Sequence, residues 1–388
     1  MNPTGAKPSR VGFLDLVRGI AILGVFGYHA YAAILETTGV PLSGPAAWVT
    51  WPFRYGWAGV ALFFVVSGFC IHTSALATAK DGIEGFLVRR FTRIYPPYLF
   101  ALVPLAALSF VRNPPLLGDH NLFQAFTHAL LIHNWFAETD QGINASFWSI
   151  AVEFQLYLAY PLLARLARRF GWGKVVAVSA MVEVGLKLVE SILLPTTGNG
   201  MPRFFVGWPL FYLFSWSLGA WLADDHAKGG NSVWARIHPA LPAAAAVAVD
   251  HLAPGHHLGF PLAAIALAAW IARRLGRDEH DVRGPWIRRH LDSVGVASYS
   301  IYLLHQPILR RGVAFAIGRF DPAVAAWAGL AMALALWPVV VWLSRAAYRW
   351  VELPSIAWGR AWIARIRSAR SAPSSDPAPV ATAASRNA

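Results

Sequence analysis

Ten long apolar segments constrain the fold of this chain of 388 residues more than any other feature. A helix needs about 20 mainly apolar residues to cross the hydrocarbon core of a bilayer, and these segments have lengths of that order. They are apolar on all faces, whereas the strands of a membrane β-barrel are alternating runs of about ten residues. We therefore expect an all-α, polytopic membrane protein with about ten transmembrane helices. The predicted spans are residues 12–35, 57–79, 94–111, 147–168, 174–194, 204–223, 237–251, 258–274, 295–317 and 323–347.

The composition excludes several other classes of protein. Hydrophobic residues make up 56% of the chain and charged residues 14%, whereas about a quarter of a typical soluble domain is charged. A disordered chain would be poorer in apolar residues, and a single cysteine, Cys70, excludes a disulfide scaffold. The formal net charge of +13 would suggest nucleic-acid binding in a soluble protein. In a membrane protein it more often marks cytoplasmic loops, so no nucleic-acid partner is expected.

The distribution of Lys and Arg predicts the orientation. Most of them lie before the first span, in the loops after spans two, four, six and eight, and after the tenth. By the positive-inside rule both termini are then cytoplasmic. We expect a cytoplasmic lead at residues 1–11, a transmembrane domain at 12–350 and a cytoplasmic tail at 351–388, disordered beyond about residue 371. The expected location is a bacterial-type cytoplasmic (inner) membrane.

Span one carries Arg18 and His29 within its apolar run. A charged side chain in hydrocarbon costs at least ~2.5–3.5 kcal/mol on insertion scales, so such residues are functional candidates. At ~1.5 Å and ~100° per residue the two lie about 16 Å apart on nearly one face, His29 in the outer half of the span. The structural alternatives are that Arg18 snorkels to the inner headgroups and that His29 is a packing residue.

Span four places Glu153 about two turns from its outer end, at a depth similar to that of His29. A carboxylate at that depth needs a partner, and pairing would orient an imidazole and stabilise its protonated form. We therefore expect Glu153 to orient His29; the alternative is a pair that only fixes helix packing. In span five, the i, i+3 and i, i+4 spacing of Glu183, Lys187 and Glu190 indicates mutual neutralisation rather than a site.

Two other spans carry candidates for which a packing role competes with a functional one. Span nine places His305 near mid-membrane, one turn after Tyr302. Span two contains Ser67 and Gly68, small residues that allow close approach of helices.

The loop after span two carries Arg89, Arg90 and Arg93. Arg90 and Arg93 are three residues apart, so on a helical turn both guanidinium groups face one way and could clamp phosphates. Arginine clusters at a membrane surface also commonly contact only lipid headgroups. The external histidines 251, 256 and 257 lack the spacing of a zinc motif, and no metal is expected.

Together these residues form five motifs that resemble those of the acyltransferase 3 family of integral membrane O-acyltransferases. The resemblance extends over most of residues 10–355. The motifs are Arg-x10-His (Arg18, His29), Phe-Phe-x-x-Ser-Gly-Phe (Phe63 to Phe69), Arg-Arg-x-x-Arg-Ile-x-Pro-x-Tyr (Arg89 to Tyr98), Trp-Ser-x-x-x-Glu (Trp148 to Glu153) and Tyr-Ser-x-Tyr-x-x-His-x-Pro (Tyr299 to Pro307). Two positions depart from the family pattern: Phe154 replaces a second glutamate, and Glu352-Leu353-Pro354 lacks the arginine of Glu-Arg-Pro.

The resemblance implies transfer of an acyl group, usually acetyl from acetyl-CoA, to a hydroxyl of an extracytoplasmic carbohydrate or similar acceptor. The phosphates of acyl-CoA would remain at Arg89, Arg90 and Arg93, because they cannot cross hydrocarbon. His29 would act as general base or as a transient acyl carrier, oriented by Glu153. Arg18 would hold the donor or stabilise negative charge. Residues expected along the substrate path are Ser67, Trp148, Ser149, Tyr157, Tyr302 and His305.

A transporter or flippase for a polar solute or lipid-linked sugar is the main alternative, since buried Arg, Glu and His would suit it on general grounds. A non-enzymatic membrane sensor is disfavoured by the five ordered motifs. The identity of the acceptor and the length of the acyl chain stay open.

Overall fold

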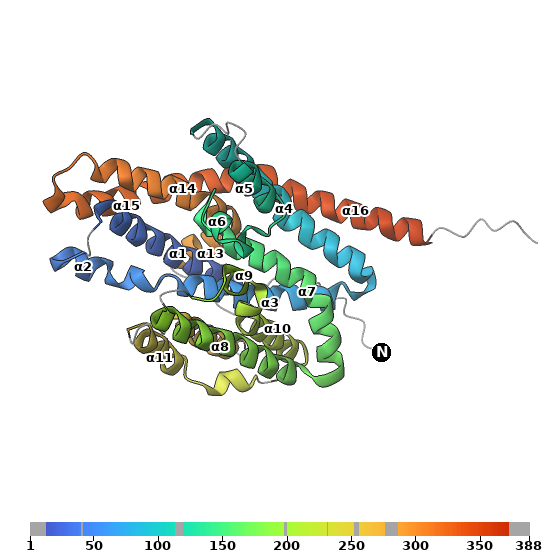
Figure 1. Ribbon diagram of the computed structural model, residues 1–388. Helices are drawn as coiled ribbons and strands as arrows, with labels where there is room; N and C mark the ends of the chain where they lie inside the picture. Colours follow the sequence, from blue (N-terminus) through green and yellow to red (C-terminus); the bar gives the residue numbers. More distant parts are fainter. Residues whose placement is uncertain are drawn as a thin grey trace, which may run out of the picture.

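The computed structural model describes residues 13–39, 42–112, 119–197, 200–230, 232–251, 256–275 and 286–371. These residues form helices joined by turns, and they contain no strand (Figure 1). The predicted N-terminal lead and the predicted disorder beyond residue 371 lie outside the described residues. The all-α class expected from the apolar segments is thus confirmed in the described part of the chain.

Each of the ten apolar segments overlaps a helix, although the sixth, residues 204–223, is interrupted and only its second half lies in the long helix that begins at Leu213. These helices are α1 (Phe13–Thr38), α3 (Ala58–Ala77), α4 (Gly82–Arg112), α7 (Trp148–Phe170), α8 (Trp172–Thr197), α10 (Leu213–Ala227), α11 (Ala240–His251), α12 (His256–Leu275), α14 (Ser298–Ile317) and α15 (Pro322–Ala347). Shorter helices lie between them or follow them: α2 (Gly44–Thr50), α5 (Asp119–Ala129), α6 (Ala137–Asp140), α9 (Arg203–Gly207), α13 (Trp286–Val296) and α16 (Leu353–Ser371).

Six helical stretches in the described part of the chain are long and apolar enough to cross a membrane. They are Phe13–Thr38, Gly44–Ala77, Ala79–Phe110, Ala145–Phe170, His257–Leu275 and Val324–Arg370. The 12 residues of α11 extend for only about 18 Å, short of the ~30 Å of the hydrocarbon core. A multi-pass membrane protein is therefore supported, while the number of ten spans and the cytoplasmic termini stay predictions.

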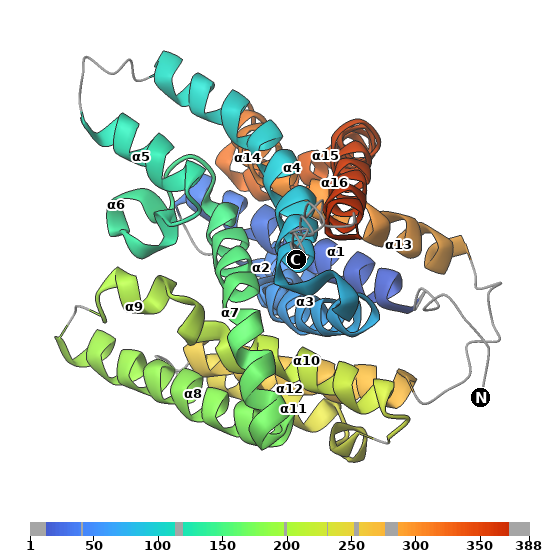
Figure 2. The same ribbon diagram turned by 90° about the vertical axis from the view of Figure 1, so that its right-hand side faces the viewer.

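The bundle is organised around α1 and α3, with α7 beside them. Viewed along its long axis, α4, α14, α15 and α16 lie on one side of this centre and α8, α10, α11 and α12 on the other (Figure 2). Helix α1 contacts α3, α13, α14 and α15, and α3 contacts α10 and α12. The functional candidates on α1, α3, α7 and α14 consequently face one another inside the bundle.

Helices α3 and α10 cross at two glycines. A Cβ on Gly68 would lie 2.0 Å from the carbonyl oxygen of Trp216, and one on Gly219 would lie 1.8 Å from that of Val65. Without side chains at these two positions the backbones approach closely, as is common where helices associate in membranes. The close approach predicted at Gly68 is confirmed.

The C-terminal helices form one continuous rod. Helix α15 passes through a single turn of π-helix, Tyr348–Glu352, into α16, which lies against α4. Arg367 pairs with Asp81, and Arg370 donates to Glu84 at 2.7 Å, so the far end of α16 is attached to the turn between α3 and α4. The π-helical turn holds the buried Glu352, and such turns are frequent at functional sites.

The glycine contact predicts a specific loss of stability. Gly68→Ala should lower the thermal unfolding midpoint, because the added methyl overpacks the crossing at a typical cost of about 1–3 kcal/mol. Gly185→Ala is the control: Gly185 is also helical, nothing lies within 4 Å of the position its Cβ would take, and Ala is the better helix former by roughly 0.5–1 kcal/mol. Thermal unfolding of both purified variants tests this. Equal midpoints for the two variants would contradict the tight crossing.

Candidate active site

Two cavities with different linings lie next to each other in the bundle. The first, of about 510 Å³, is called the arginine cavity and is lined among others by Arg18, Arg89, Arg90, Arg93, Glu153 and Glu352. The second, of about 970 Å³, is called the histidine cavity and is lined among others by His29, Trp57, Trp148, Lys187, Tyr212 and Asp250. Val60 and Tyr302 line both cavities.

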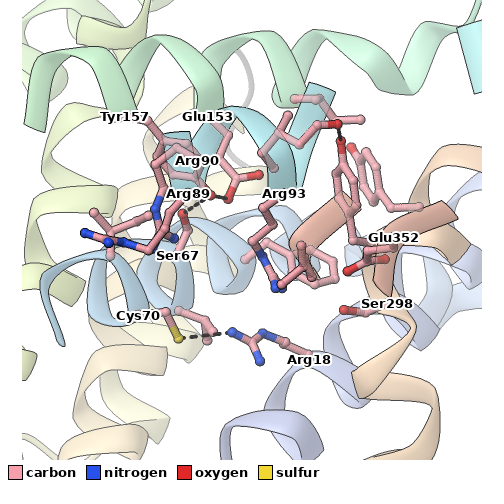
Figure 3. Close-up of a pocket in the computed structure, with 18 of the residues that line it drawn as sticks. Arg18, Ser67, Cys70, Arg89, Arg90, Arg93, Glu153, Tyr157, Ser298 and Glu352 are labelled. Atoms are coloured by element: carbon pink, nitrogen blue, oxygen red, sulfur yellow. Dashed lines mark hydrogen bonds between the residues drawn. The ribbon is translucent and has the colours of Figure 1, made fainter. Parts of the chain in front are cut away.

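Arg18 turns into the arginine cavity. Its guanidinium donates to Asp15 Oδ1 at 2.9 Å and to Cys70 Sγ at 3.0 Å, which ties α1 to α3 (Figure 3). These contacts are directed into the bundle, so snorkelling toward headgroups does not describe Arg18.

Three arginines of α4, Arg89, Arg90 and Arg93, line the arginine cavity together but have different partners. Arg89 donates to Asp81, and Arg90 donates to Ser74 Oγ at 2.8 Å. Arg93 points into the space between Arg18 and Glu352 (Figure 3), and within the described ranges its guanidinium has no hydrogen bond or salt bridge. The arginines are thus gathered as expected, and Arg93 is the one that presents its donors to the cavity.

Glu153 also lies in the arginine cavity, where its carboxylate accepts a hydrogen bond from the Tyr157 hydroxyl. Ser67 Oγ donates to the same hydroxyl at 3.2 Å and accepts from Trp216 Nε1 at 3.2 Å. The expected contact between Glu153 and His29 is not formed: Glu153 does not line the histidine cavity and His29 does not line the arginine cavity. The two residues face different cavities, because similar depth along two helices does not fix the direction in which each side chain points around its helix.

The partner of His29 is His305. Their Nδ1 and Nε2 atoms, respectively, are 2.9 Å apart, and His305 Nδ1 lies 2.9 Å from the carbonyl oxygen of Tyr302 and 3.2 Å from that of Ile301. Carbonyl oxygens only accept, so Nδ1 of His305 must carry a hydrogen. In the neutral ring its Nε2 then accepts from His29 Nδ1, which leaves the lone pair of His29 on Nε2. The sequence indicated each histidine as a separate candidate, and it did not predict that His29 and His305 pair.

Ser149 and Tyr302 lie near the junction of the two cavities. Ser149 Oγ and the Tyr302 hydroxyl are 2.7 Å apart, and the ring of Phe63 packs edge-on against Tyr302 with a centroid separation of 5.9 Å. Trp148 lines the histidine cavity one residue before Ser149 and packs against Tyr212 at 5.2 Å. The Trp-Ser pair at the start of α7 thus contributes one side chain to the histidine cavity and one to the junction.

Two residues that the sequence did not assign to a site line the cavities. Glu352 of the arginine cavity accepts from Ser300 Oγ at 2.9 Å and is almost fully buried. Lys187 of the histidine cavity lies 4.0 Å from Glu183 Oε1, and its Nζ lies 3.9 Å from the centroid of the Phe211 ring. The sequence feature that could have indicated Glu352 is the incomplete Glu-Leu-Pro motif. The feature that could have indicated Lys187 is its positive charge within an apolar span.

The predicted ladder in α8 is formed in part. Glu183 and Lys187 pair, and Glu183 also accepts from the backbone and hydroxyl of Ser215 at 3.0 and 2.8 Å. Glu190 instead accepts from the backbone N–H of Met201. Within the described residues no group of three or more His, Cys, Asp or Glu side chains is arranged to hold a metal ion.

The two cavities differ in their chemistry. The arginine cavity offers guanidinium donors that suit phosphate or carboxylate groups. The histidine cavity offers an imidazole lone pair beside aromatic rings, which suits proton abstraction from a bound hydroxyl. Because Val60 and Tyr302 line both cavities, the two are adjacent at these residues, which we call the junction.

Comparison with known proteins gives a consistent assignment. The sequence profile of the acyltransferase 3 family, described as an acyltransferase domain, matches residues 11–349. The chain is 28% identical over 272 residues to the acyltransferase MdmB of Streptomyces mycarofaciens, covering 66% of this chain and 69% of that protein. No solved structure matches.

Two O-acetyltransferases are also similar to this chain. O-acetyltransferase OatA of Staphylococcus aureus is 25% identical over 217 residues, which cover 51% of this chain and 32% of that protein. Peptidoglycan O-acetyltransferase OatA of Listeria monocytogenes is 26% identical over 211 residues, covering 50% of this chain and 30% of that protein. The similarity thus spans about a third of the length of these two relatives.

The buried pair in α8 predicts an unequal effect of single and double substitutions. Glu183→Leu should lower the unfolding midpoint strongly, because an unpaired buried charge typically costs about 3–5 kcal/mol. Replacing both residues, Glu183→Leu with Lys187→Leu, should restore part of the loss, since no charge is left buried. Thermal unfolding of both purified variants measures this. A double variant as unstable as Glu183→Leu would contradict pairing as the cause.

Proposed function

The chain belongs to the acyltransferase 3 family, and from that premise we propose that it moves an acyl group, in particular acetyl, from cytoplasmic acyl-CoA to a hydroxyl of an extracytoplasmic carbohydrate or similar acceptor. The family makes it an acyltransferase. Acyl transfer is therefore favoured over the transport of a polar solute, the alternative that the buried charges alone left open. The proposed location is the cytoplasmic membrane of a bacterium, with both termini on the cytoplasmic side.

The observation that carries this proposal is that two cavities of different chemistry are adjacent and share Tyr302 in their linings. Coenzyme A carries several phosphate charges, so its head must stay at the membrane surface while its thin pantetheine arm enters the protein. The arginine cavity begins among residues of the predicted cytoplasmic loop and offers the guanidinium groups that such a donor needs. The histidine cavity lies on the other side of the junction and would receive the acceptor.

On the donor side, Arg93 contacts the bound acyl-CoA directly. It is the α4 arginine whose guanidinium has no hydrogen bond or salt bridge in the described residues, whereas Arg89 and Arg90 shape the wall through Asp81 and Ser74. Arg18 stabilises negative charge deeper in the cavity. Ser67, Glu153 and Tyr157 form one hydrogen-bonded wall of the donor path.

On the acceptor side, His29 acts as the general base. Its Nδ1–H donates to His305, so its Nε2 is free to take the proton of the acceptor hydroxyl as the hydroxyl oxygen attacks the thioester carbonyl. The carbon–sulfur bond then breaks, the thiolate of coenzyme A leaves, and the proton held by His29 neutralises it. Tyr302 and Ser149, which lie near the junction, and Trp148 position the two substrates. The same Nε2 would be the nucleophile if His29 carried the acyl group transiently.

The relatives support the acceptor class. The Listeria monocytogenes protein is named a peptidoglycan O-acetyltransferase, so its acceptor is a glycan. The aromatic side chains of the histidine cavity, Trp57, Trp148 and Tyr212, have the apolar faces against which sugar rings pack.

The role of the histidine pair predicts a graded loss of transfer. His29→Ala should lower kcat by about 10²–10⁴-fold, the usual contribution of a general base. His305→Ala should lower kcat less, with KM for the donor unchanged, and His305→Gln should recover part of the activity because its amide oxygen can accept from His29. Acyl transfer by purified variants in lipid discs measures this, with the exposed His290→Ala as control. Transfer at the unaltered rate by His29→Ala would refute the catalytic proposal.

The role of Arg93 predicts a salt-dependent loss of donor affinity. Arg93→Ala should raise KM for acyl-CoA by about 10–100-fold, because a hydrogen bond to a charged group contributes roughly 1.5–3 kcal/mol. The difference from the unaltered enzyme should shrink as salt is added, since salt screens the interaction. The exposed Arg289→Ala is the control for loss of positive charge alone. An unchanged KM for Arg93→Ala would count against phosphate binding at this position.

A further inference from the structure

A third cavity, of about 1030 Å³, lies beside the turn that joins α3 to α4. It is lined by the ends of α3, α7 and α10 and by the start of α4, and we call it the side cavity. Its volume is at the upper end of the ~300–1,000 Å³ typical of small-molecule sites. Nothing in the transfer step described above uses it.

The rim of the side cavity is basic. Four cationic side chains line it, Arg89, Arg165, Arg168 and Lys228, against one carboxylate, Asp224. Asp224 accepts from Lys228 at 2.6 Å, so that pair is neutral. Arg165 and Arg168 are one turn apart on α7, and neither has a hydrogen bond or salt bridge within the residues that the structure describes. Two guanidinium groups on one face of a helix end form a place where phosphates bind.

The inner wall of the side cavity is aromatic and polar rather than basic. His72 is 5% exposed; its Nδ1 is 2.9 Å from the Tyr160 hydroxyl, and its Nε2 has no hydrogen-bond partner and lies 3.5 Å from Asp224 Oδ1. Trp172 packs edge-on against His72 with a centroid separation of 5.0 Å. A wall of this kind matches a heteroaromatic ring that carries an amino group, because the ring packs on the aromatic side chains and the amine can donate to the carboxylate.

The side cavity and the arginine cavity share Arg89. The two cavities are therefore adjacent at this side chain, and a long ligand that passes it would occupy both. The end in the side cavity would carry one phosphate and a heteroaromatic ring, and the remaining phosphates and the thin arm would lie in the arginine cavity.

We propose that the side cavity binds the 3′-phosphoadenosine end of the acyl-CoA donor, with Arg165 and Arg168 holding the 3′-phosphate, while the diphosphate lies toward Arg93 in the arginine cavity. This inference rests on the proposed function, and it assigns the nucleotide end of the donor to residues outside the five sequence motifs. An anionic lipid headgroup shares the phosphate chemistry. The nucleotide fits better because it also supplies a planar ring for the wall formed by His72, Tyr160 and Trp172.

Donor truncation tests the proposal. Purified protein in discs of neutral phosphatidylcholine is assayed with acetyl-CoA and with S-acetyl-pantetheine, which lacks the nucleotide. The double variant Arg165→Ala/Arg168→Ala should raise KM for acetyl-CoA at least tenfold, leave kcat unchanged and leave KM for S-acetyl-pantetheine unchanged. Arg169→Ala is the control: it removes one positive charge from the same helix end, but Arg169 does not line the side cavity. The control should behave as the unaltered enzyme does with both donors.

Direct binding gives a second readout that needs no turnover. Calorimetric titration with adenosine 3′,5′-bisphosphate should show binding to the unaltered protein and at least tenfold weaker binding to the double variant. Equal affinity of both proteins, or equal loss with both acetyl donors, would overturn the proposal. Displacement of the bisphosphate by phosphatidylglycerol added to the discs, with no change in KM for acetyl-CoA in the double variant, would assign the cavity to lipid instead.

Failure of the proposed function would give a different set of results from failure of this inference. If the unaltered protein transferred acetyl from neither donor, the choice of acyl-CoA would be contradicted. Binding of the bisphosphate and its dependence on Arg165 and Arg168 would still decide whether the side cavity takes a nucleotide.

Discussion

A charge buried among apolar helices must face another charge, a polar partner or a cavity, and this constraint explains most of the interior of the bundle. Arg18 meets Asp15 and Cys70, and Lys187 meets Glu183 and three aromatic rings. Arg93 and Glu352 face the arginine cavity. Glu352 also accepts a hydrogen bond from Ser300 there. The residues that could not be satisfied by packing alone are therefore the ones that define the cavities.

The division into two cavities separates two chemical requirements that conflict in one space. A donor with several phosphates needs a cationic surface, whereas a general base gains positive charge when it takes a proton, which nearby guanidinium groups oppose. The paired histidines lie beside one cavity, where Arg54 and Lys187 are paired with carboxylates, and the arginines of α1 and α4 line the other. The acyl group is the part of the donor that must reach the junction.

Hydropathy was enough to predict the helices, because a segment long enough for the hydrocarbon core forms a helix on backbone hydrogen bonding alone. It also predicted that Arg18, Glu153 and His305 would lie inside the bundle: His305 is fully buried, and Arg18 and Glu153 are partly exposed to the arginine cavity. Their partners were less predictable, since the period of a helix relates residues on one helix and gives no orientation between two helices. Glu153 accordingly bonds to Tyr157 of its own helix, while the partner of His29 comes from α14. Glu352 was missed because a π-helical turn, which has no simple sequence pattern, precedes α16.

The π-helical turn at Tyr348–Glu352 sets the rotational register of everything that follows it on the rod. One residue fewer in this turn would rotate α16 by about 100° and shift it by ~1.5 Å relative to α15. Gly359 would then no longer face Thr92, and Arg367 would no longer face Asp81. The length of this short turn thus decides whether the C-terminal end of α16 can pack against α4 beside the arginine cavity.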